Sequence, residues 1–465
     1  MSVTNTWKVY TQPMNIIKRM WEWFLVIISR NKQQTNKHVA MMEPSCKTNL
    51  PTSDVLVESI LKNELIRQST SLNLIASENL VSEAVLKVQN NVFINKRADG
   101  YPGYRHYEGC GFVDELEKVV IDRAKRLFKC KYANVQPYSG SQMNQAVMLT
   151  LLSPGDTIMR MHLEWDGHLT HGLATNISGM WFNTVTYGVD PKTGTIDMNN
   201  VLNCAIRHRP KLIIVGSTSY PRTIDWKAFR RVADIVDSFL LADISHIAGL
   251  IVTGLQPSPI DHCDVVTTTT HESLKGPCSG LILSNNQELS KHISTTLFPR
   301  LQDGPMINVM VATAVALLEA KQDEYRTWST IVVENAKAMA KRFKNRKIDI
   351  VSNGTDNHLV IIDLKKLGIT DKQVTSWLDR CYITTNKTDI SNHLLSTDVV
   401  SGLRLGTYAC TSRGMRRDVF EKMADMIADI LLEIKNKGEV SLPLKTKTRM
   451  VVLGLADKYP ICYNV

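Results

Sequence analysis

The stretch NVQPYSGSQMNQAVMLTLL contains residues that could bind a phosphate. Ser139, Gly140 and Ser141 lie on a predicted turn that opens a helix. At such a position, free backbone N–H groups and hydroxyls can hold an anion. Taken alone, the same residues are more often a simple helix N-cap.

A second stretch, LLADISHIAGL, ends an apolar run with a carboxylate. Asp243 leaves the predicted strand and His246 follows three residues later. A buried carboxylate requires a cationic or protonated partner, because leaving it unpaired is costly. A protonated pyridine nitrogen would be one such partner, and a salt bridge to a nearby arginine is the commoner alternative.

A third apolar run, VVTTTT, is followed by His271, Glu272 and Lys275. Together the polar residues of these three stretches could contact a phosphate, a ring nitrogen and a carbonyl group. That combination favours a pocket for pyridoxal 5'-phosphate.

Alternating helical and extended patterns must position these residues. VDELEKVVIDRAKRLF has helical periodicity, whereas KLIIVGSTS, SFLLADIS and DVVTTTT read as short buried strands. This alternation predicts an α/β sheet, in which ligands bind beyond the carboxyl ends of the strands. With 465 residues, 43% of them hydrophobic, the chain is long enough for two packed domains.

Composition excludes several other classes of protein. The nine cysteines are odd in number and never spaced C-x-x-C, which argues against a disulfide framework and a zinc site and favours a reducing compartment. No metal site is predicted. The formal net charge is +10, yet no basic block with interleaved aromatic residues indicates a nucleic-acid groove.

The N-terminal segment differs from the rest of the chain. Seven Lys and Arg residues stand against two Glu residues among the first fifty, and MNIIKRMWEWFLVIISR could form an amphipathic helix too short to span a bilayer. We interpret residues 1–50 as an extension that could be a mitochondrial presequence. The alternative is an extension without a targeting signal. No other run approaches transmembrane length.

A series of longer motifs resembles the serine hydroxymethyltransferase family. The motifs are SLNLIASEN, DGYPGYRHYEGC, YANVQPYSGSQMN, GHLTHG, YGVD, DISHIAGL, VVTTTTH, SNGTDNHL and SGLRLGT. The resemblance implies an α/β, aspartate aminotransferase-like (fold type I) architecture with a large, mostly parallel seven-stranded sheet domain at 51–325. A smaller α+β C-terminal domain would occupy 326–465. It also implies a homodimer or homotetramer with sites shared between subunits.

The resemblance further implies interconversion of serine and glycine, with tetrahydrofolate as co-substrate and pyridoxal 5'-phosphate as cofactor. Matched motif by motif, the cofactor would contact Ser139, Gly140, Ser141, His168, Asp243 and His271. The catalytic positions would be Asp99, Tyr107 and His246. Arg404 would bind the amino-acid carboxylate, and Leu163, Gly167 and Leu169 would lie on the folate-binding loop.

The sequence departs from the family pattern at the most important position. The lysine that forms the Schiff base follows VVTTTTH in the family, and this chain has Glu272 there. A carboxylate cannot form an imine. Lys275 is the obvious substitute, but a displacement of three residues in a turn would aim it elsewhere.

Other positions depart as well. Asp99 replaces a longer glutamate, Arg97 replaces a tyrosine, and Thr388 replaces an asparagine that faces folate. Arg300, Leu301 and Asp303 of FPRLQDGP stand in a loop that is glycine-rich in the family. The sequence therefore predicts a serine hydroxymethyltransferase homologue with weak or no activity.

Three alternatives remain open. The chain could be a slow enzyme that binds the cofactor without a covalent bond. It could instead be a non-catalytic partner in a hetero-oligomer with an active paralogue. The third alternative is a folate- or RNA-binding protein on the same scaffold, for which the basic net charge is the main support.

Overall fold

The computed structural model describes residues 54–162, 168–216, 218–388, 402–461 and 463. The chain divides into two units. One comprises Met1–Ile66 together with Tyr463–Val465, and the other is Arg67–Cys462. The predicted presequence at 1–50 lies outside the described residues. Helix α2 (Val55–Thr70) contains no buried residue. None of the described helices is long and apolar enough to cross a bilayer.

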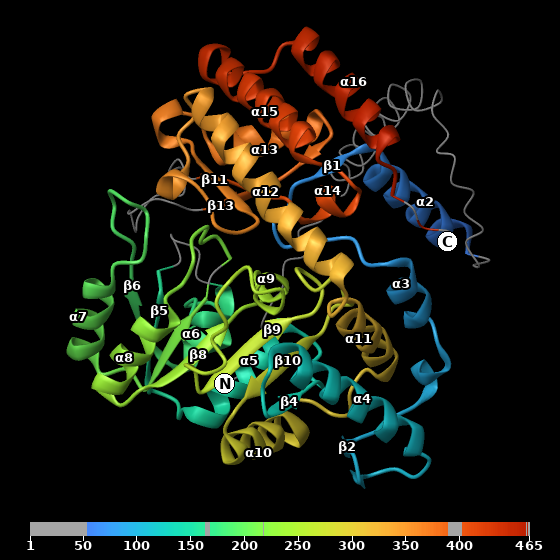
Figure 1. Ribbon diagram of the computed structural model, residues 1–465, viewed down its shortest axis with the longest axis vertical. Coiled ribbons are helices and arrows are strands. Elements are labelled where there is room, and N and C mark those ends of the chain that lie inside the picture. Colours follow the sequence, from blue (N-terminus) through green and yellow to red (C-terminus); the bar gives the residue numbers. More distant parts are fainter. Residues whose placement is uncertain (1–53, 163–167, 217, 389–401, 462, 464–465) are drawn as a thin grey trace, which may run out of the picture. The chain divides into compact units, whose positions relative to one another are not determined.

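A seven-stranded sheet is the centre of the Arg67–Cys462 unit (Figure 1). In spatial order its strands are β4 (Tyr132–Asn134), β10 (Gly280–Ser284), β9 (Val265–Thr269), β8 (Phe239–Asp243), β7 (Leu212–Val215), β5 (Thr157–Met161) and β6 (Asn183–Tyr187). Strand β10 runs antiparallel to both of its neighbours, and the other described pairs are parallel. The predicted α/β class with a large, mostly parallel seven-stranded sheet is confirmed.

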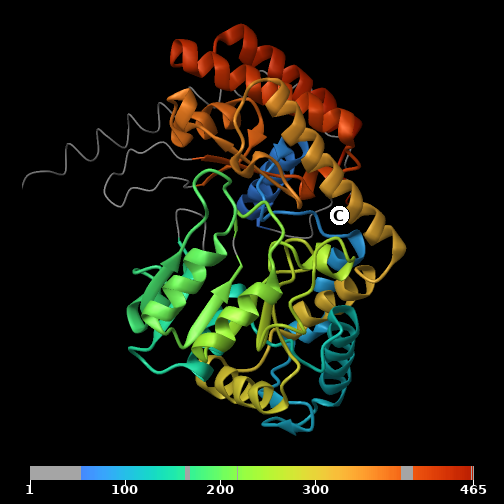
Figure 2. The ribbon, with the colours of Figure 1, turned by 60° about the vertical axis from the view of Figure 1, so that its left-hand side comes forward.

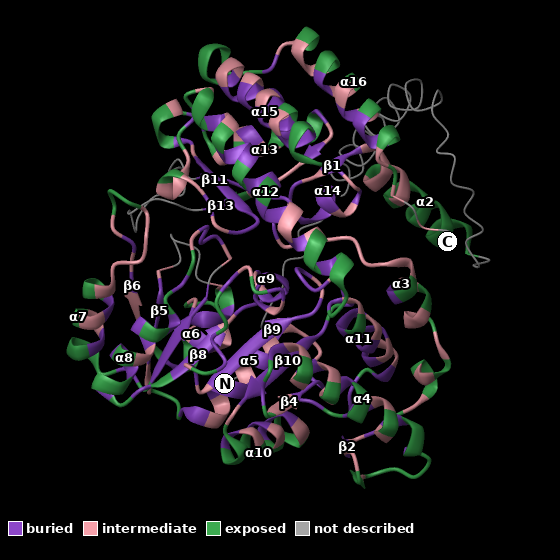
Figure 3. Cartoon of the chain, in the orientation of Figure 1, coloured by how far each residue is buried: buried purple, intermediate pink, exposed green. Residues whose placement is uncertain are grey.

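Side chains on both faces of this sheet are buried. In β7, Ile213 and Val215 pack into one apolar cluster, while Leu212 and Ile214 pack into another. Because side chains alternate along a strand, these clusters lie on opposite faces. Two covered faces explain why the strand reads LIIV without polar alternation. Figure 3 shows strands β9 and β10 of this sheet as buried.

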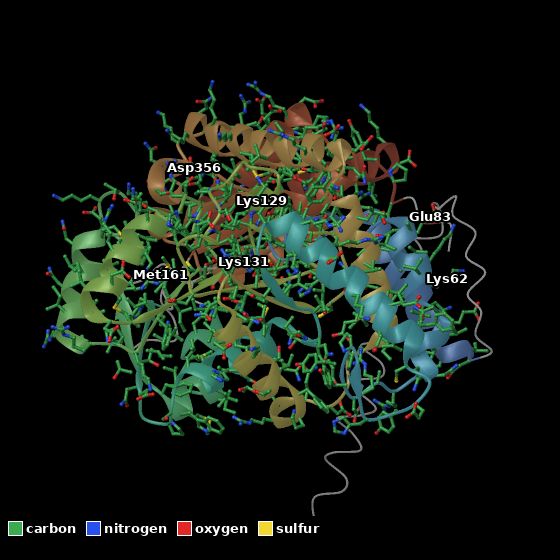
Figure 4. All side chains as sticks on the ribbon, turned by 60° about the horizontal axis from the view of Figure 1, so that its bottom comes forward. Lys62, Glu83, Lys129, Lys131, Met161 and Asp356 are labelled. Atoms are coloured by element: carbon green, nitrogen blue, oxygen red, sulfur yellow. The ribbon has the colours of Figure 1, made fainter. Side chains whose placement is uncertain are left out.

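Helices supply the cover of the sheet. The first apolar cluster includes residues of α4 (Gly111–Phe128), α7 (Met198–His208), α8 (Trp226–Val236), α9 (Ala248–Val252) and α11 (Ile307–Glu319). The second cluster includes residues of α5 (Gly140–Leu151) and α10 (Gln287–Thr295). Helix α4 is followed by its C-cap Lys129, labelled in Figure 4, which has a left-handed backbone conformation.

Short elements complete this part of the chain. They are α3 (Glu83–Gln89), α6 (Ile177–Trp181), the helical turns η1 (Val92–Asn95), η3 (Leu169–His171) and η4 (Thr296–Leu301), and the hairpin strands β2 (Gly100–Tyr101) and β3 (Tyr104–Arg105). The η4 turn includes Arg300 and Leu301, two of the residues that depart from the family's glycine-rich loop.

A separate core forms from the C-terminal elements, drawn orange to red in Figure 2. Its three-stranded sheet has the order β11 (Leu359–Asp363), β14 (Gly402–Gly406) and β13 (Asn386–Thr388). The helices are α12 (Asp323–Asn345), α13 (Asp371–Arg380), α14 (Tyr408–Ser412), α15 (Arg417–Lys437) and α16 (Leu442–Lys458), with turns η5 (Val351–Asn353) and η6 (Lys365–Leu367). Strand β1 (Leu72–Asn73) joins this core and pairs with β12 (Ile383–Thr384). The predicted domain boundaries stay a prediction.

Candidate functional site

A cavity of about 250 Å³ lies at the carboxyl ends of the central strands. Strands β8 and β9 are parallel neighbours with Asp243 paired to Thr267, so the residues that follow each strand emerge at one edge of the sheet. The lining residues are Ser139, Gly140, Ser141, Met143, His168, His171, Thr218, Asp243, Ser245, His246, Thr269, His271, Glu272 and Cys278. The structure therefore brings together the polar residues of the three stretches that the sequence singles out, around Ser139, Asp243 and Glu272.

The N-terminus of helix α5 opens onto this cavity. Ser139 is the N-cap, and its Oγ accepts a hydrogen bond from the backbone N–H of Gln142 (3.3 Å). A Cβ atom at Gly140 would lie 2.9 Å from Cγ2 of Thr269, so a glycine lets the turn approach β9 closely. The first turn of a helix presents backbone N–H groups that suit a phosphate. This part of the cavity can hold an anion.

Asp243 is held by three neighbours. Asn144 Nδ2 donates to its Oδ2 (2.9 Å), His171 Nε2 lies 3.0 Å from the same oxygen, and Ser245 Oγ donates to Oδ1 (2.7 Å). Burial alone would raise the pKa of this carboxyl, but the hydrogen bond and charge of His171 hold it well below its usual range. Asp243 is therefore an ionised hydrogen-bond acceptor at the cavity wall.

Loss of the His171 contact should destabilise the fold. His171→Phe keeps a buried ring, since His171 is 1% exposed, but removes a hydrogen bond to a buried carboxylate. We expect the free energy of unfolding to fall by about 1.5–3 kcal/mol, measured by urea denaturation. His292→Phe, an exposed position on α10, is the control and should change it by less than about 0.5 kcal/mol. Equal effects of both substitutions would contradict this role of His171.

His168 lies beside this network, directly before the η3 turn. Its Nδ1 is 2.6 Å from Thr170 Oγ1, and its ring meets the ring of His171 edge to face, with centroids 5.5 Å apart. Burial, together with the neighbouring charge of His171, lowers the pKa of His168 to about 4. A neutral imidazole at the cavity wall can contact an aromatic ring without adding charge.

Donor atoms of His168, His171 and Asp243 all lie within 4.8 Å of one another, a spacing that could also suit a metal ion. The sequence predicts no metal site. In the structure His171 also pairs with Asp243, and His168 with Thr170.

Glu272 lies in the same cavity and is buried, with 7% of its surface exposed. Its Oε2 is 3.5 Å from Nδ1 of His246, and its Oε1 is 3.9 Å from Nε2 of His271. Among the described residues, Oε2 has no hydrogen-bond partner. Burial, and then the negative charge of Asp243, raises the pKa of Glu272 to about 8. At neutral pH this group is mostly an uncharged acid.

Lys275 does not line the cavity. Its Nζ lies over the ring of Trp328, 4.9 Å from the ring centroid, and burial lowers its pKa. Its backbone has a φ of 56°, in the left-handed region. No lysine is found among the described residues that line the cavity.

Arg404 lies just outside the cavity, on strand β14 of the smaller sheet. Its Nη1 donates to the carbonyl of Thr218 (2.6 Å), and its Nε donates to Oδ1 of Asn386 (3.2 Å). Burial, and then the positive charge of Arg404, lowers the pKa of His246. The predicted carboxylate-binding arginine therefore belongs to the smaller core and influences the cavity by its charge.

Other predicted site residues lie elsewhere. Asp99 accepts a hydrogen bond from the backbone of Gly304 (3.1 Å), Tyr107 Oη lies 3.4 Å from Asp99 Oδ2, and neither residue lines the cavity. Tyr107 is 48% exposed. Leu169, on η3, is also exposed. Leu163 and Gly167 fall outside the described residues.

Several contact residues were missed by reasoning from the sequence. Asn144, His171 and Ser245 all bind Asp243. Signals existed for two of them: the second histidine of GHLTHG is placed three residues after His168, and a serine two residues after an aspartate can bond back to it. Asn144 sits one helical turn after Gly140 and had no sequence signal of its own.

A comparison with protein families matches residues 50–427 to the family described as serine hydroxymethyltransferase. The chain belongs to the serine hydroxymethyltransferase family. Similar curated proteins support this. A serine hydroxymethyltransferase from Rickettsia akari is 50% identical over 410 residues, covering 88% of this chain and 96% of that protein. One from Prochlorococcus marinus is 47% identical over 417 residues, covering 90% of this chain and 98% of that protein.

The residues of this family member fit the cofactor pyridoxal 5'-phosphate in part. The N-terminus of α5 with Gly140 fits its phosphate, and the ionised Asp243 fits a protonated ring nitrogen. Glu272 does not fit its covalent attachment, because the buried group offers a carboxyl where the family motif has an amine. The cavity therefore suits a ligand held by non-covalent contacts.

Proposed function

We propose that this chain is a serine hydroxymethyltransferase homologue with little or no transferase activity. The observation that carries the proposal is the buried carboxyl of Glu272 in the same cavity as Ser139 and Asp243. Loss of the lysine removes the amine that would bind the cofactor covalently and later displace the product. Substrate would be serine or glycine with tetrahydrofolate, as the family resemblance implies.

The chain's own residues would then act mainly in binding. Ser139, Gly140 and Ser141 would hold the phosphate, Asp243 would accept a hydrogen bond from the ring nitrogen, and His168 would contact the ring. When bound, pyridoxal 5'-phosphate supplies an electron sink for amino-acid chemistry. Glu272, as an uncharged acid, can donate or accept a hydrogen bond but cannot attack an aldehyde.

The altered loop after η4 adds a second obstacle. Tyr138, the residue before Ser139, donates its hydroxyl to Asp303 and to the carbonyl of Gly304. Burial, together with the hydrogen bond to Asp303, raises the pKa of Tyr138. The loop therefore adds an acidic side chain close to the phosphate-binding turn, which would oppose an anionic ligand.

Two measurements on the purified full chain test this proposal. The first follows glycine formation from serine with tetrahydrofolate and pyridoxal 5'-phosphate, beside the similar protein from Rickettsia akari. The second treats the chain and cofactor with borohydride and maps modified lysines by mass spectrometry. We expect no turnover above buffer and no lysine label. A label on Lys275 together with glycine formation would overturn the proposal.

A second candidate function is a non-catalytic subunit in a hetero-oligomer with an active paralogue. It is favoured by the placement of Asp99 and the exposed Tyr107 outside the cavity of their own chain, since the family resemblance implies sites shared between subunits. Co-purification with an active homologue, and a change in its turnover, would test this. A mitochondrial location, based on residues 1–50, is likewise a proposal.

A further inference from the structure

Buried polar atoms without hydrogen-bond partners gather at one wall of the cavity. Among the described residues, these are Oε2 of Glu272, Nδ1 of His246, Nδ1 of His271 and Oγ1 of Thr269. All four residues line the cavity, and the side chains of Glu272 and His246 are more than nine-tenths buried. Unsatisfied buried polar atoms are costly, so they indicate a missing polar partner.

The charges around this wall indicate which charge the missing partner should carry. Burial lowers the pKa of both His246 and His271, so both imidazoles are neutral and neither would neutralise Glu272 when it is ionised. Asp243 adds a negative charge, whereas the guanidinium of Arg404 is hydrogen-bonded to the carbonyl of Thr218. Tyr408 and Cys278, the other titratable groups that sense Glu272, have raised pKa values. The described residues that line the cavity therefore include no lysine or arginine, and their uncharged donors, such as the hydroxyl of Thr269, would leave an ionised Glu272 without a cationic partner.

An ammonium group would satisfy these atoms. It has three N–H donors and one positive charge, while the carboxylate of Glu272 and a suitably protonated neutral imidazole can each accept a hydrogen bond. A buried carboxylate gains most from a partner that neutralises its charge and also donates a hydrogen bond. In the family motif, this position carries an amine that meets a ligand aldehyde; here the carboxyl suits a ligand amine.

We propose that the cavity selects pyridoxamine 5'-phosphate, the amine form of the cofactor, over pyridoxal 5'-phosphate, the aldehyde form, with Glu272 binding the ligand ammonium. The inference rests on the proposed function, because the phosphate and ring contacts are those assigned there to Ser139 and Asp243. No covalent bond to the ligand forms or breaks. Glu272 gives up its acidic proton to solvent as the ammonium binds.

Three ligands that differ at a single ring substituent test this proposal on the full chain. Pyridoxamine, pyridoxine and pyridoxal 5'-phosphates carry an ammonium, a hydroxyl and an aldehyde at that place, and their affinities can be compared by titration calorimetry at neutral pH. We expect the amine form to bind at least about tenfold more tightly than either of the others. Glu272→Gln should reduce this preference to about threefold or less, because it keeps the shape and removes the charge.

Controls separate the possible outcomes. Glu288→Gln, an exposed change on α10, should leave the ranking of the three ligands unaltered. If the amine form binds no better than pyridoxine 5'-phosphate, selection by Glu272 is overturned while the cofactor pocket stands. If none of the three binds, both the pocket and the selection are overturned. A lysine labelled by borohydride with the aldehyde form would refute the proposed loss of covalent attachment, whatever the ranking. Should Glu272→Gln fail to fold, the ranking on the unmodified chain still decides.

Discussion

Glu272→Lys is expected to make the chain bind pyridoxal 5'-phosphate covalently. The substituted side chain would enter a cavity that already holds a phosphate-binding turn and the ionised Asp243. Burial favours the neutral amine, which is the nucleophilic form. A visible absorption band on cofactor addition, and a borohydride label mapped to position 272 by mass spectrometry, would show the bond.

Glu272→Lys should restore covalent attachment of pyridoxal 5'-phosphate more completely than it restores turnover. Asp99, Arg97 and the loop with Asp303 would still differ from the family pattern, and a misplaced acid or base costs about 10²–10⁴ in rate. We therefore expect glycine formation to stay about that far below the rate of the similar protein from Rickettsia akari. Lys275→Gln in the same background is the control and should not change the label. A label on Lys275 instead of position 272 would contradict this prediction.

The ligand-free chain should lose stability as the pH rises, and Glu272 should cause much of the loss. Its folded pKa of about 8 lies above the ordinary value of 4.5, so between these values the folded state holds a proton that the unfolded state has released. The stabilisation is complete below about pH 4.5 and is lost as the pH rises to about 8. At about 1.4 kcal/mol per pH unit, the loss is about 5 kcal/mol.

Glu272→Gln isolates this contribution, because an amide of nearly the same shape does not titrate. Urea unfolding of both proteins at several pH values would give the difference in the free energy of unfolding. Across this pH range, the free energy of unfolding of the glutamate form should fall by several kcal/mol relative to that of the glutamine form. Parallel curves for the glutamate and glutamine forms would show that Glu272 is ionised in the folded chain.

The sequence predicted those parts of the site that depend on strand ends. The runs LLADIS and VVTTTT are β8 and β9, and because parallel strands end at a common edge, Asp243, His271 and Glu272 meet. The turn at Ser139 opens α5, as its helix-start pattern predicts. Apolar runs and caps are local signals, so one sequence was enough to place these residues.

Contacts between distant segments could not be predicted in the same way. The pairing of Asn144 with Asp243 joins positions 99 residues apart, and it depends on how α5 packs on the sheet. Arg404 contacts Thr218 across 186 residues of sequence, a pairing that no local pattern records. Asp99 and Tyr107 match family motifs, yet within one chain they pack beside Gly304 and outside the cavity. A motif identifies residues, but it does not show how segments that are distant in the sequence pack together.

The hydrogen bonds of Asp243 give a reason, other than catalysis, for the survival of family motifs in this chain. Its side chain connects the end of β8 to α5 through Asn144 and to η3 through His171, so the same residues that suit a ring nitrogen also hold three parts of the fold together. Selection for a stable protein would therefore preserve them after selection for catalysis had ended. Among the described residues, Oε2 of Glu272 makes no comparable connection to another element. Position 272 is therefore where a lost requirement for chemistry would first become visible in the sequence.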